Sequence, residues 1–158
     1  MPERAILFLA IAQTLIWASA SYIFAALLLW WEADFGWSRT QLTGAFTAAL
    51  LVSAVSAPFV GRLIDARRGA LVMGVSTLLA GFLVASLALV TDLWQFYMVW
   101  ILIGLTISGC LYEPCFAILT KARGPAGRKA IVVITLVAGF ASTISFPVAN
   151  GIAAAADW

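Results

Sequence analysis

Hydrophobic residues run along the chain in five long, unbroken stretches that short polar segments separate. Each stretch reaches the length of about 18 residues or more at which an α-helix can cross the hydrocarbon core of a bilayer. The runs lack the alternation with polar residues that strands of a membrane barrel show, so helices are predicted. The sequence therefore predicts an all-α membrane protein, a five-helix bundle in a single transmembrane domain over residues 1–158. The spans are expected at about 5–31, 41–60, 70–90, 94–120 and 130–156.

Charged residues are scarce and lie mostly between these stretches. They form 10% of the chain, against about 25% in soluble domains, which argues against a soluble protein. Of nine basic residues, only Arg39 falls on one side of the predicted membrane, and the others share the opposite side. Because basic residues concentrate in cytoplasmic loops, we expect a cytoplasmic N-terminus and an outer C-terminus in a multi-pass protein of the inner (plasma) membrane. The net charge of +2 reflects this topology, and no nucleic-acid partner is expected.

Residues suited to catalysis or metal binding are few. The chain has no histidine, and Cys110 and Cys115 point about 140° apart on one predicted helix, which is unsuitable for a disulfide. No nucleophile–base pair, phosphate-binding loop or set of metal ligands is visible. We therefore expect no enzyme activity, no metal and no cofactor, and we interpret both cysteines as small apolar packing residues.

Small residues recur at helical spacing in two of the predicted spans. The span at 41–60 carries one at every fourth position, and the span at 94–120 carries Gly104 and Ser108. Such stripes let helices approach closely, which is a main packing device in lipid. We expect these residues to pack helices together, and the first stripe is also a candidate surface for a second half of the protein. Its members are Ala45, Ala49, Ser53, Ala57 and Gly61.

The segment "GRLIDARRGA" joins the second and third predicted spans. It resembles the loop motif of the major facilitator superfamily, approximately G-x-L-x-D-R-x-G-R-R, with Gly61, Asp65 and Gly69 at matching positions and Arg67 and Arg68 keeping its basic character. Ala66 and Ala70 depart from the basic residues usual there. By itself, Gly61 would let the chain turn at the membrane surface, and Asp65 would pair with arginines or cap a helix. A plain basic loop that sets the topology is the alternative interpretation.

Other segments are similar to bacterial members of the same superfamily, namely "FGWSR", "YEPCFA" and "AGFASTISFPVANG". The resemblance implies half of a twelve-span transporter, and this chain would correspond to five of the six spans of an N-terminal half. Two positions depart from the pattern. Trp100 stands where many proton-coupled members carry an arginine, and Phe146 precedes Pro147 where antiporters tend to have glycine.

Polar residues within the spans are candidates for a substrate or proton pathway. Gln13 and Trp17 share one face of the first span, and Thr106 and Glu113 share a face of the fourth. The resemblance implies that these two spans line the central path, and Asn150 in the fifth span is a further candidate. The alternative for each is hydrogen bonding or packing between helices inside the bundle.

Glu113 is the one ionisable charge between Leu93 and Thr120. A charge near the centre of a bilayer costs roughly 2.5–3.5 kcal/mol on insertion scales, and intramembrane acids are functional sites by default. No basic residue lies at matching depth, so the side chain is a neutral acid, a carboxylate in a wet cavity, or one paired with an absent partner. A reversible proton carrier is one role it would suit. Pro114 removes the usual donor to the Cys110 carbonyl, so a protonated Glu113 is a candidate local donor.

Together these features predict a secondary active transporter, as a half-unit or fragment, that moves a small organic solute by alternating access, with proton coupling as an option. Such a protein would need the lipid bilayer, a small-molecule substrate and a second half, supplied by another chain, a homodimer or further sequence. The alternative is a non-transporting accessory or assembly subunit of a larger membrane complex.

Overall fold

The structure, a computed structural model, describes residues 3–155 and contains only helices and short connections in that range. Four helical stretches in it are long and apolar enough to cross a membrane. They span Glu3–Phe35, Arg39–Leu89, Leu93–Arg123 and Gly127–Ala155. The all-helical prediction is therefore confirmed for these residues. Ala156, the expected end of the last span, and Trp158 lie outside the described range.

The first stretch is a helix with a wider turn in its middle. It consists of α1 (Glu3–Trp17), a π-helical turn η1 (Ala18–Tyr22) and α2 (Ile23–Phe35). Gly36 ends α2 in the left-handed conformation with φ of 66°, which glycine adopts at little cost. Ser38 then starts the next helix with a capping box, in which its side chain and that of Gln41 each accept a backbone N–H.

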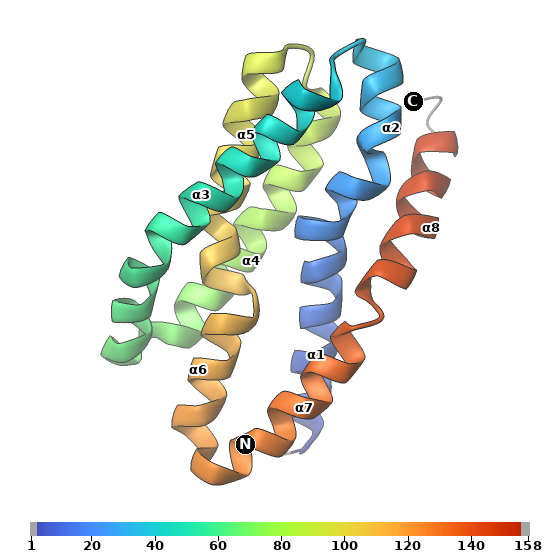
Figure 1. Cartoon of the computed structure of the whole chain (residues 1–158). Coiled ribbons are helices and arrows are strands. Elements are labelled where there is room, and N and C mark those ends of the chain that lie inside the picture. Colours follow the sequence, from blue (N-terminus) through green and yellow to red (C-terminus); the bar gives the residue numbers. More distant parts are fainter. Residues whose placement is uncertain (1–2, 156–158) are drawn as a thin grey trace.

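The second stretch doubles back on itself, as Figure 1 shows. Helix α3 (Arg39–Leu63) leads into η2 (Ile64–Arg68), which is followed by α4 (Gly69–Ser86) and η3 (Leu87–Leu89). The reversal occurs at Ala66 and Arg67, and Arg67 has a φ of 62°. The expectation that Gly61 makes this turn is wrong, because Gly61 lies inside α3 with helical neighbours on both sides.

The last two stretches are each broken near their middle. Helix α5 (Leu93–Cys110) is separated from α6 (Tyr112–Arg123) by Leu111, whose backbone is extended. A short turn, η4 (Gly124–Ala126), then leads to α7 (Gly127–Ala138), which a break at Gly139 and Phe140 separates from α8 (Ala141–Ala155). The two runs that the sequence predicts as single spans are thus pairs of shorter helices.

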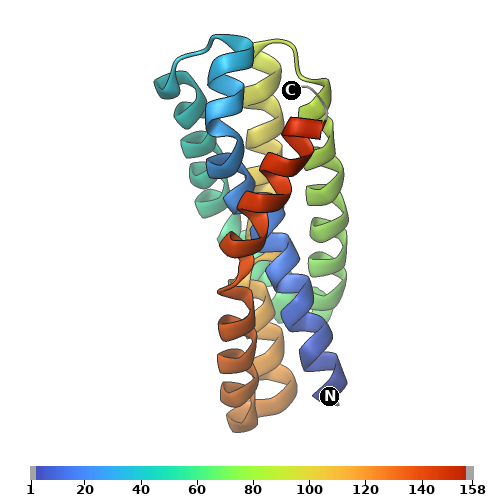
Figure 2. The ribbon, with the colours of Figure 1, turned by 90° about the vertical axis from the view of Figure 1, so that its right-hand side faces the viewer.

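The helices pack in two groups that share the long axis of the molecule. Helix α5 lies between α3 and α4, whereas α1 packs along α7 and α2 packs along α8. In Figure 2, the chain of α7 and α8 crosses the first stretch near the middle of the molecule. The basic loops between α3 and α4 and between α6 and α7 lie at the same end of the bundle as the start of α1.

Buried apolar side chains form two separate clusters, one toward each end of the bundle. The larger is rich in aromatic rings, and Trp100 contacts Trp31 and Phe96 at ring-centroid distances of 6.2 and 6.1 Å. Trp100 is a fully buried core residue. The smaller cluster joins α1, α6 and α7 through small and aliphatic side chains, namely Ala10, Cys115, Leu119, Ala130 and Ile134.

Small residues bring α3 and α5 into close contact. Ala45 and Ala49 are fully buried, and a Cβ atom added to Gly104 would overlap the Ala49 backbone carbonyl. Lower on the same pair of helices, Ser56 Oγ and Ser108 Oγ hydrogen-bond at 3.1 Å. The predicted use of small residues for close helix approach is confirmed for Ala49 and Gly104, although Ala57 on the same stripe remains exposed.

The outside of the bundle is apolar, in contrast to the surface of a soluble protein. Large hydrophobic side chains such as Leu78 and Phe82 are more than two-thirds exposed along α4. Contiguous apolar surface on this scale is a hallmark of contact with lipid, where its exposure to the surroundings costs nothing. The two described ion pairs lie near the helix ends, Arg39 with Glu32 at 2.7 Å and Lys121 with Asp65 at 2.6 Å.

The close approach of α3 and α5 makes a testable prediction. Gly104→Ala should destabilise the fold by about 1–3 kcal/mol, because the new methyl group forces two backbones apart. Gly74→Ala is the matched control, since nothing lies within 4 Å of a Cβ atom there and the substitution should be neutral or stabilising by about 0.5–1 kcal/mol. Thermal unfolding in detergent would measure both. Equal stability of the two variants would contradict the packing described.

Candidate functional site

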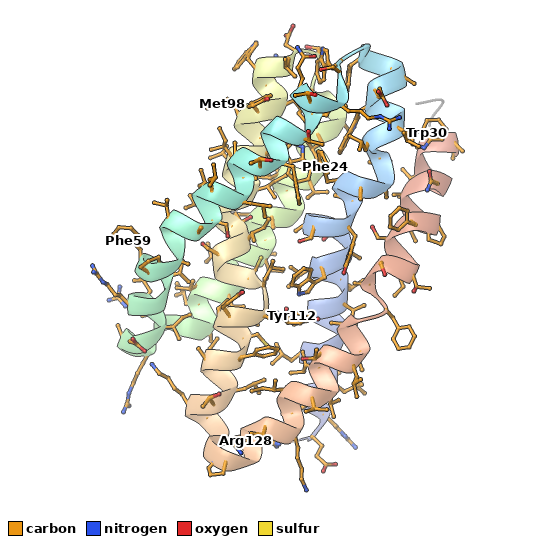
Figure 3. The ribbon with its side chains drawn as sticks, in the orientation of Figure 1. Phe24, Trp30, Phe59, Met98, Tyr112 and Arg128 are labelled. Carbon is orange, nitrogen blue, oxygen red and sulfur yellow. The ribbon has the colours of Figure 1, made fainter. Side chains whose placement is uncertain are left out.

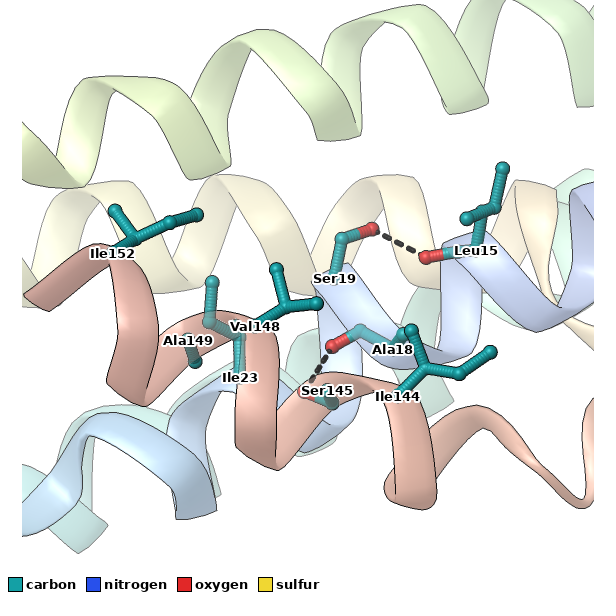
Figure 4. Close-up of a pocket in the computed structure, with 9 residues that line it drawn as sticks. All are labelled: Leu15, Ala18, Ser19, Ile23, Ile144, Ser145, Val148, Ala149 and Ile152. Atoms are coloured by element: carbon teal, nitrogen blue, oxygen red, sulfur yellow. Dashed lines mark hydrogen bonds between the residues drawn. The ribbon is translucent and has the colours of Figure 1, made fainter.

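The middle of the bundle contains irregular backbone in three of the helical stretches, and at two of these places a side chain from another helix donates a hydrogen bond to a backbone carbonyl. In the first stretch, a π-helical turn covers Ala18–Tyr22 and includes the Ala18 carbonyl oxygen. Ser145 Oγ on α8 donates a hydrogen bond to this oxygen at 2.8 Å (Figure 4). Ser19 Oγ donates to the Leu15 carbonyl at 2.8 Å one turn earlier. The turn is thus held by one contact within its helix and one from α8.

The break at Leu111 is supported in the same way from α1. Pro114 has no N–H, so it cannot donate to the Cys110 carbonyl four residues before it. The Gln13 side chain on α1 supplies the donor instead, because its Nε2 donates a hydrogen bond to the Cys110 carbonyl at 2.9 Å. Gln13 and Cys110 are both fully buried. The donor at this carbonyl is therefore Gln13 and not Glu113, which corrects the expectation from the sequence.

Aromatic side chains gather beside this hydrogen bond. Trp17, one turn after Gln13 on α1, lies against Tyr112 with ring centroids 4.8 Å apart, and Tyr22 is 6.1 Å from Trp17. Phe116 stacks on Tyr112 at 5.1 Å. We call these four residues the aromatic cluster. All four are only partly buried. Figure 3 shows Tyr112 between α6 and the lower part of α1, in the middle of the face toward the viewer.

Glu113 lies on a different side of α6 from the aromatic cluster. Its side chain is exposed and lines a pocket of about 240 Å³ together with Asp65, Ser108 and the end of α3. Asp65 on this pocket accepts a hydrogen bond from Lys121 Nζ at 2.6 Å, and the same nitrogen donates to the Ile64 carbonyl at 3.2 Å. Glu113 thus shares a pocket with a residue of the loop motif.

The loop motif contributes to the packing of helices at the end of the bundle where α3 turns into α4. Asp65 pairs with Lys121 instead of an arginine, whereas Arg67 and Arg68 extend into the surroundings. Gly69 is buried, and a Cβ atom there would fall 2.8 Å from the Ile118 side chain. This glycine therefore lets the start of α4 lie close to α6.

The remaining candidates from the sequence lie elsewhere. Thr106 is buried, and its Oγ1 donates to the Ile103 carbonyl of its own helix at 2.7 Å. Asn150 is exposed on α8, where its Oδ1 accepts from Trp30 Nε1 at 2.8 Å and its Nδ2 donates to the Phe146 carbonyl at 2.8 Å. The structure thus brings Gln13 and Trp17 next to the α5–α6 break, places Glu113 beside the loop motif, and leaves Thr106 and Asn150 in separate contacts.

Two residues at the centre are not singled out by sequence reasoning. Ser145 was part of an ordinary apolar span, yet it supplies the hydrogen bond to the π-helical turn. Tyr112 is next to Glu113 in sequence, and its partners on α1 cannot be inferred from spacing within one helix. A tyrosine two residues before a proline that interrupts a predicted span is a signal that could have drawn attention to it.

An apolar cavity of about 320 Å³ lies between the π-helical turn and α8 (Figure 4). Its walls include Ile23, Val148 and Ile152, and Ser19 and Ser145 provide its hydroxyl groups. Because those hydroxyls already donate to backbone carbonyls, the cavity offers mainly apolar contacts. Residues 3–155 contain no group of three or more histidine, cysteine or acidic residues that could hold a metal ion.

Comparison with protein families gives one match. The model of the Major Facilitator Superfamily matches residues 9–158, which is nearly the whole chain. No match was found among curated proteins. The same holds for solved structures.

The hydrogen bond between Gln13 and Cys110 makes a prediction that a double-mutant cycle can test. Gln13→Leu should cost about 1–3 kcal/mol of stability, because it leaves a buried carbonyl without a donor. Pro114→Ala restores a backbone N–H for the same carbonyl, so Gln13→Leu should cost much less in that background. Unfolding of the parent, the two single variants and the double variant in detergent gives the coupling free energy between the two substitutions. Strictly additive effects of the two substitutions would show that Gln13 does not replace the missing donor.

Proposed function

The chain belongs to the Major Facilitator Superfamily, and on this basis we propose that it forms part of a secondary active transporter for a small organic solute. Transport proceeds by alternating access, in which one bundle of helices rocks against another around a central site. The observation that supports this role best is the meeting of irregular helices at mid-depth, where Gln13 and Ser145 donate hydrogen bonds to the carbonyls of Cys110 and Ala18.

Interrupted helices are characteristic of transport sites. Inside a bilayer, non-helical backbone is tolerated where protein covers it or where it lines a cavity. In transporters, substrate and ion sites lie near the midplane and are formed by such discontinuous helices. The breaks at Leu111 and at Gly139–Phe140, with the π-helical turn Ala18–Tyr22, match this arrangement.

The membrane topology that fits this role has five crossings. The turn at Ala66 and Arg67 divides the stretch Arg39–Leu89 into two legs, each long enough to cross the membrane. The basic loops then lie together at one end, which we assign to the cytoplasm of the inner (plasma) membrane with the N-terminus. The outer end carries the turn at Gly36 and the ion pair of Arg39 with Glu32.

A second bundle is needed to enclose the substrate. The face that carries the aromatic cluster is flanked by α3, whose side chains Leu51, Val55 and Phe59 line a shallow apolar groove of about 430 Å³ with Leu105. A second half, as another chain, a second copy or further sequence, would cover this face and close a path along α1 and α6.

Glu113 is the proposed carrier of a coupled proton. Its carboxyl group faces a pocket of about 240 Å³ that also holds the Asp65 carboxylate near the cytoplasmic end. The pocket is large enough for several water molecules, which take about 30 Å³ each in the liquid, so a proton could reach Glu113 from that side. Glu113 and Pro114 lie in the first turn of α6, so the charge on Glu113 acts next to the α5–α6 break.

Solute flux tests the proposed function directly. The full chain, purified and reconstituted into liposomes with an inward proton gradient, should take up a subset of a panel of small organic solutes faster than empty liposomes do. Dissipation of the gradient should slow that uptake. An absence of flux, together with stoichiometric association with an unrelated membrane complex, would replace transport by the accessory role.

Substitution of Glu113 tests proton coupling. Glu113→Gln should preserve folding but remove the pH dependence of uptake, because an amide cannot take up a proton. Glu32→Gln is the control, since Glu32 pairs with Arg39 at the opposite end of the bundle. Uptake at a series of pH values measures the effect. A Glu113→Gln protein with full and still pH-dependent uptake would exclude Glu113 as the proton carrier.

The proposed topology predicts which sites can be labelled from outside the cell. In a background with Cys110→Ala and Cys115→Ala, an impermeant thiol reagent should modify Thr40→Cys but not Ala122→Cys in sealed cells. Both positions are exposed, so reactivity depends on the side of the membrane alone. Both should react once the membrane is permeabilised. Modification of Ala122→Cys in sealed cells would show that the orientation is reversed.

A further inference from the structure

A pocket of about 260 Å³ lies between the start of α4 and α6, at the end of the bundle that carries the basic loops. The described residues that line it include two cations, Arg67 and Lys121, and no acid. The rest of its wall is mainly apolar and includes Ala70 and Ile118. We call this space the basic pocket. It is separate from the pocket into which Glu113 faces.

The two cations of the basic pocket are held differently. Lys121 Nζ donates to Asp65 Oδ1 at 2.6 Å and to the Ile64 carbonyl at 3.2 Å, which fixes the ammonium group beside the pocket. An ammonium group has three N–H donors, so one remains for a ligand. Arg67 is exposed, and its guanidinium forms no ion pair within residues 3–155. Because Asp65 offsets the charge of Lys121, the charge of Arg67 is left unbalanced.

The charges around the basic pocket favour an anion. Eight of the nine basic residues share this end of the bundle with the acids Glu3 and Asp65. Figure 3 shows one of the eight, Arg128, at this end. The excess of positive charge attracts anions to this end, and the pocket offers them a guanidinium and an ammonium partner.

An apolar stripe on α4 begins beside the basic pocket. Leu71 directly follows Ala70 of the pocket, and Val75, Leu78 and Phe82 continue the same face of the helix at spacings of four, three and four residues. These four side chains are between 49% and 77% exposed. The stripe runs from the basic end toward the middle of the bundle, as the acyl chain of a lipid would from a headgroup in the pocket. A free phosphate ion would leave the stripe unused, so pocket and stripe together fit a lipid.

We infer that the basic pocket binds the phosphate group of an anionic phospholipid whose acyl chains lie along the apolar stripe of α4. The planar guanidinium of Arg67 can pair with two phosphate oxygens, and Lys121 would add its remaining N–H. The ammonium group of a zwitterionic lipid would bring positive charge close to both cations, so such a lipid should bind more weakly. This site is separate from the proposed proton carrier, and the inference holds whether or not the chain transports a solute.

Native mass spectrometry of the full chain in a neutral detergent tests the inference. Phosphatidylglycerol and phosphatidylethanolamine with identical acyl chains are titrated separately, and glycerol phosphate supplies the same phosphate group without acyl chains. The first phosphatidylglycerol should bind with a dissociation constant about fivefold lower than that of phosphatidylethanolamine, the factor that one basic residue near the headgroup contributes. Glycerol phosphate should bind at least about tenfold more weakly, because it cannot use the stripe.

Two outcomes of these titrations would overturn the inference. Equal affinity for the two phospholipids would exclude a site for an anionic headgroup. Binding of glycerol phosphate as tight as that of phosphatidylglycerol would assign the pocket to a free phosphate and not to a lipid.

Variants show whether the basic pocket itself carries the binding. Arg67→Gln should raise the dissociation constant for phosphatidylglycerol about fivefold, whereas Arg67→Lys keeps the charge and should stay within about twofold of the parent. Arg128→Gln removes the same charge from the same end but outside the pocket, so it is the matched control and should have a much smaller effect. Thermal unfolding in detergent should be unchanged in all three variants. Unchanged binding in Arg67→Gln, or equal weakening in Arg67→Gln and Arg128→Gln, would exclude the pocket.

Discussion

The need to satisfy every backbone hydrogen bond inside the membrane governs this structure. Lipid offers no partner for a free carbonyl, so a helix that crosses the bilayer can be broken only where another part of the protein supplies the missing group. Gln13 meets this need for the Cys110 carbonyl, and Ser145 adds a hydrogen bond from α8 to the Ala18 carbonyl of the π-helical turn. Each bond joins two stretches far apart in sequence, so the breaks fix how the helices sit against one another. The backbone at the centre of the bundle is thereby irregular.

The packing on either side of the breaks explains how this irregularity is tolerated. Toward the end of the bundle that carries Gly36, close contact of α3 and α5 at Ala49 and Gly104 adjoins a core of buried aromatic rings. Toward the other end, a second core of small and aliphatic residues joins α1, α6 and α7. The breaks at Leu111 and at Gly139–Phe140 lie between the helices that build the two cores. Two packed ends are thus joined by a discontinuous middle.

Much of the fold is predictable from the sequence, because hydrophobic runs report membrane helices by length alone. The small residues at Ala49 and Gly104 also gave a correct indication of close packing. The breaks in the helices were harder to predict from the sequence. Pro114 signalled a free carbonyl at Cys110, but its donor, Gln13, lies 97 residues away in sequence and only tertiary structure identifies it. The break at Gly139–Phe140 precedes Pro147, and no simple rule places it there. The partners of Tyr112 on α1 were out of reach for the same reason, since hydrophobic pattern specifies a face and not the neighbour that covers it.

Solid-state NMR can test the central claim, that a side chain from α1 completes the backbone of the broken helix. The chain has two cysteines, so carbonyl labelling with ¹³C in a Cys115→Ala protein marks Cys110 alone. Side-chain ¹⁵N labelling of glutamine then reports on Gln13, because Gln41 and Gln95 lie near the other end of the bundle. The account predicts strong dipolar dephasing of the Cys110 carbonyl by a glutamine side-chain nitrogen in lipid bilayers, and its loss in Gln13→Leu. A carbonyl that shows no such dephasing in the parent protein would contradict the account.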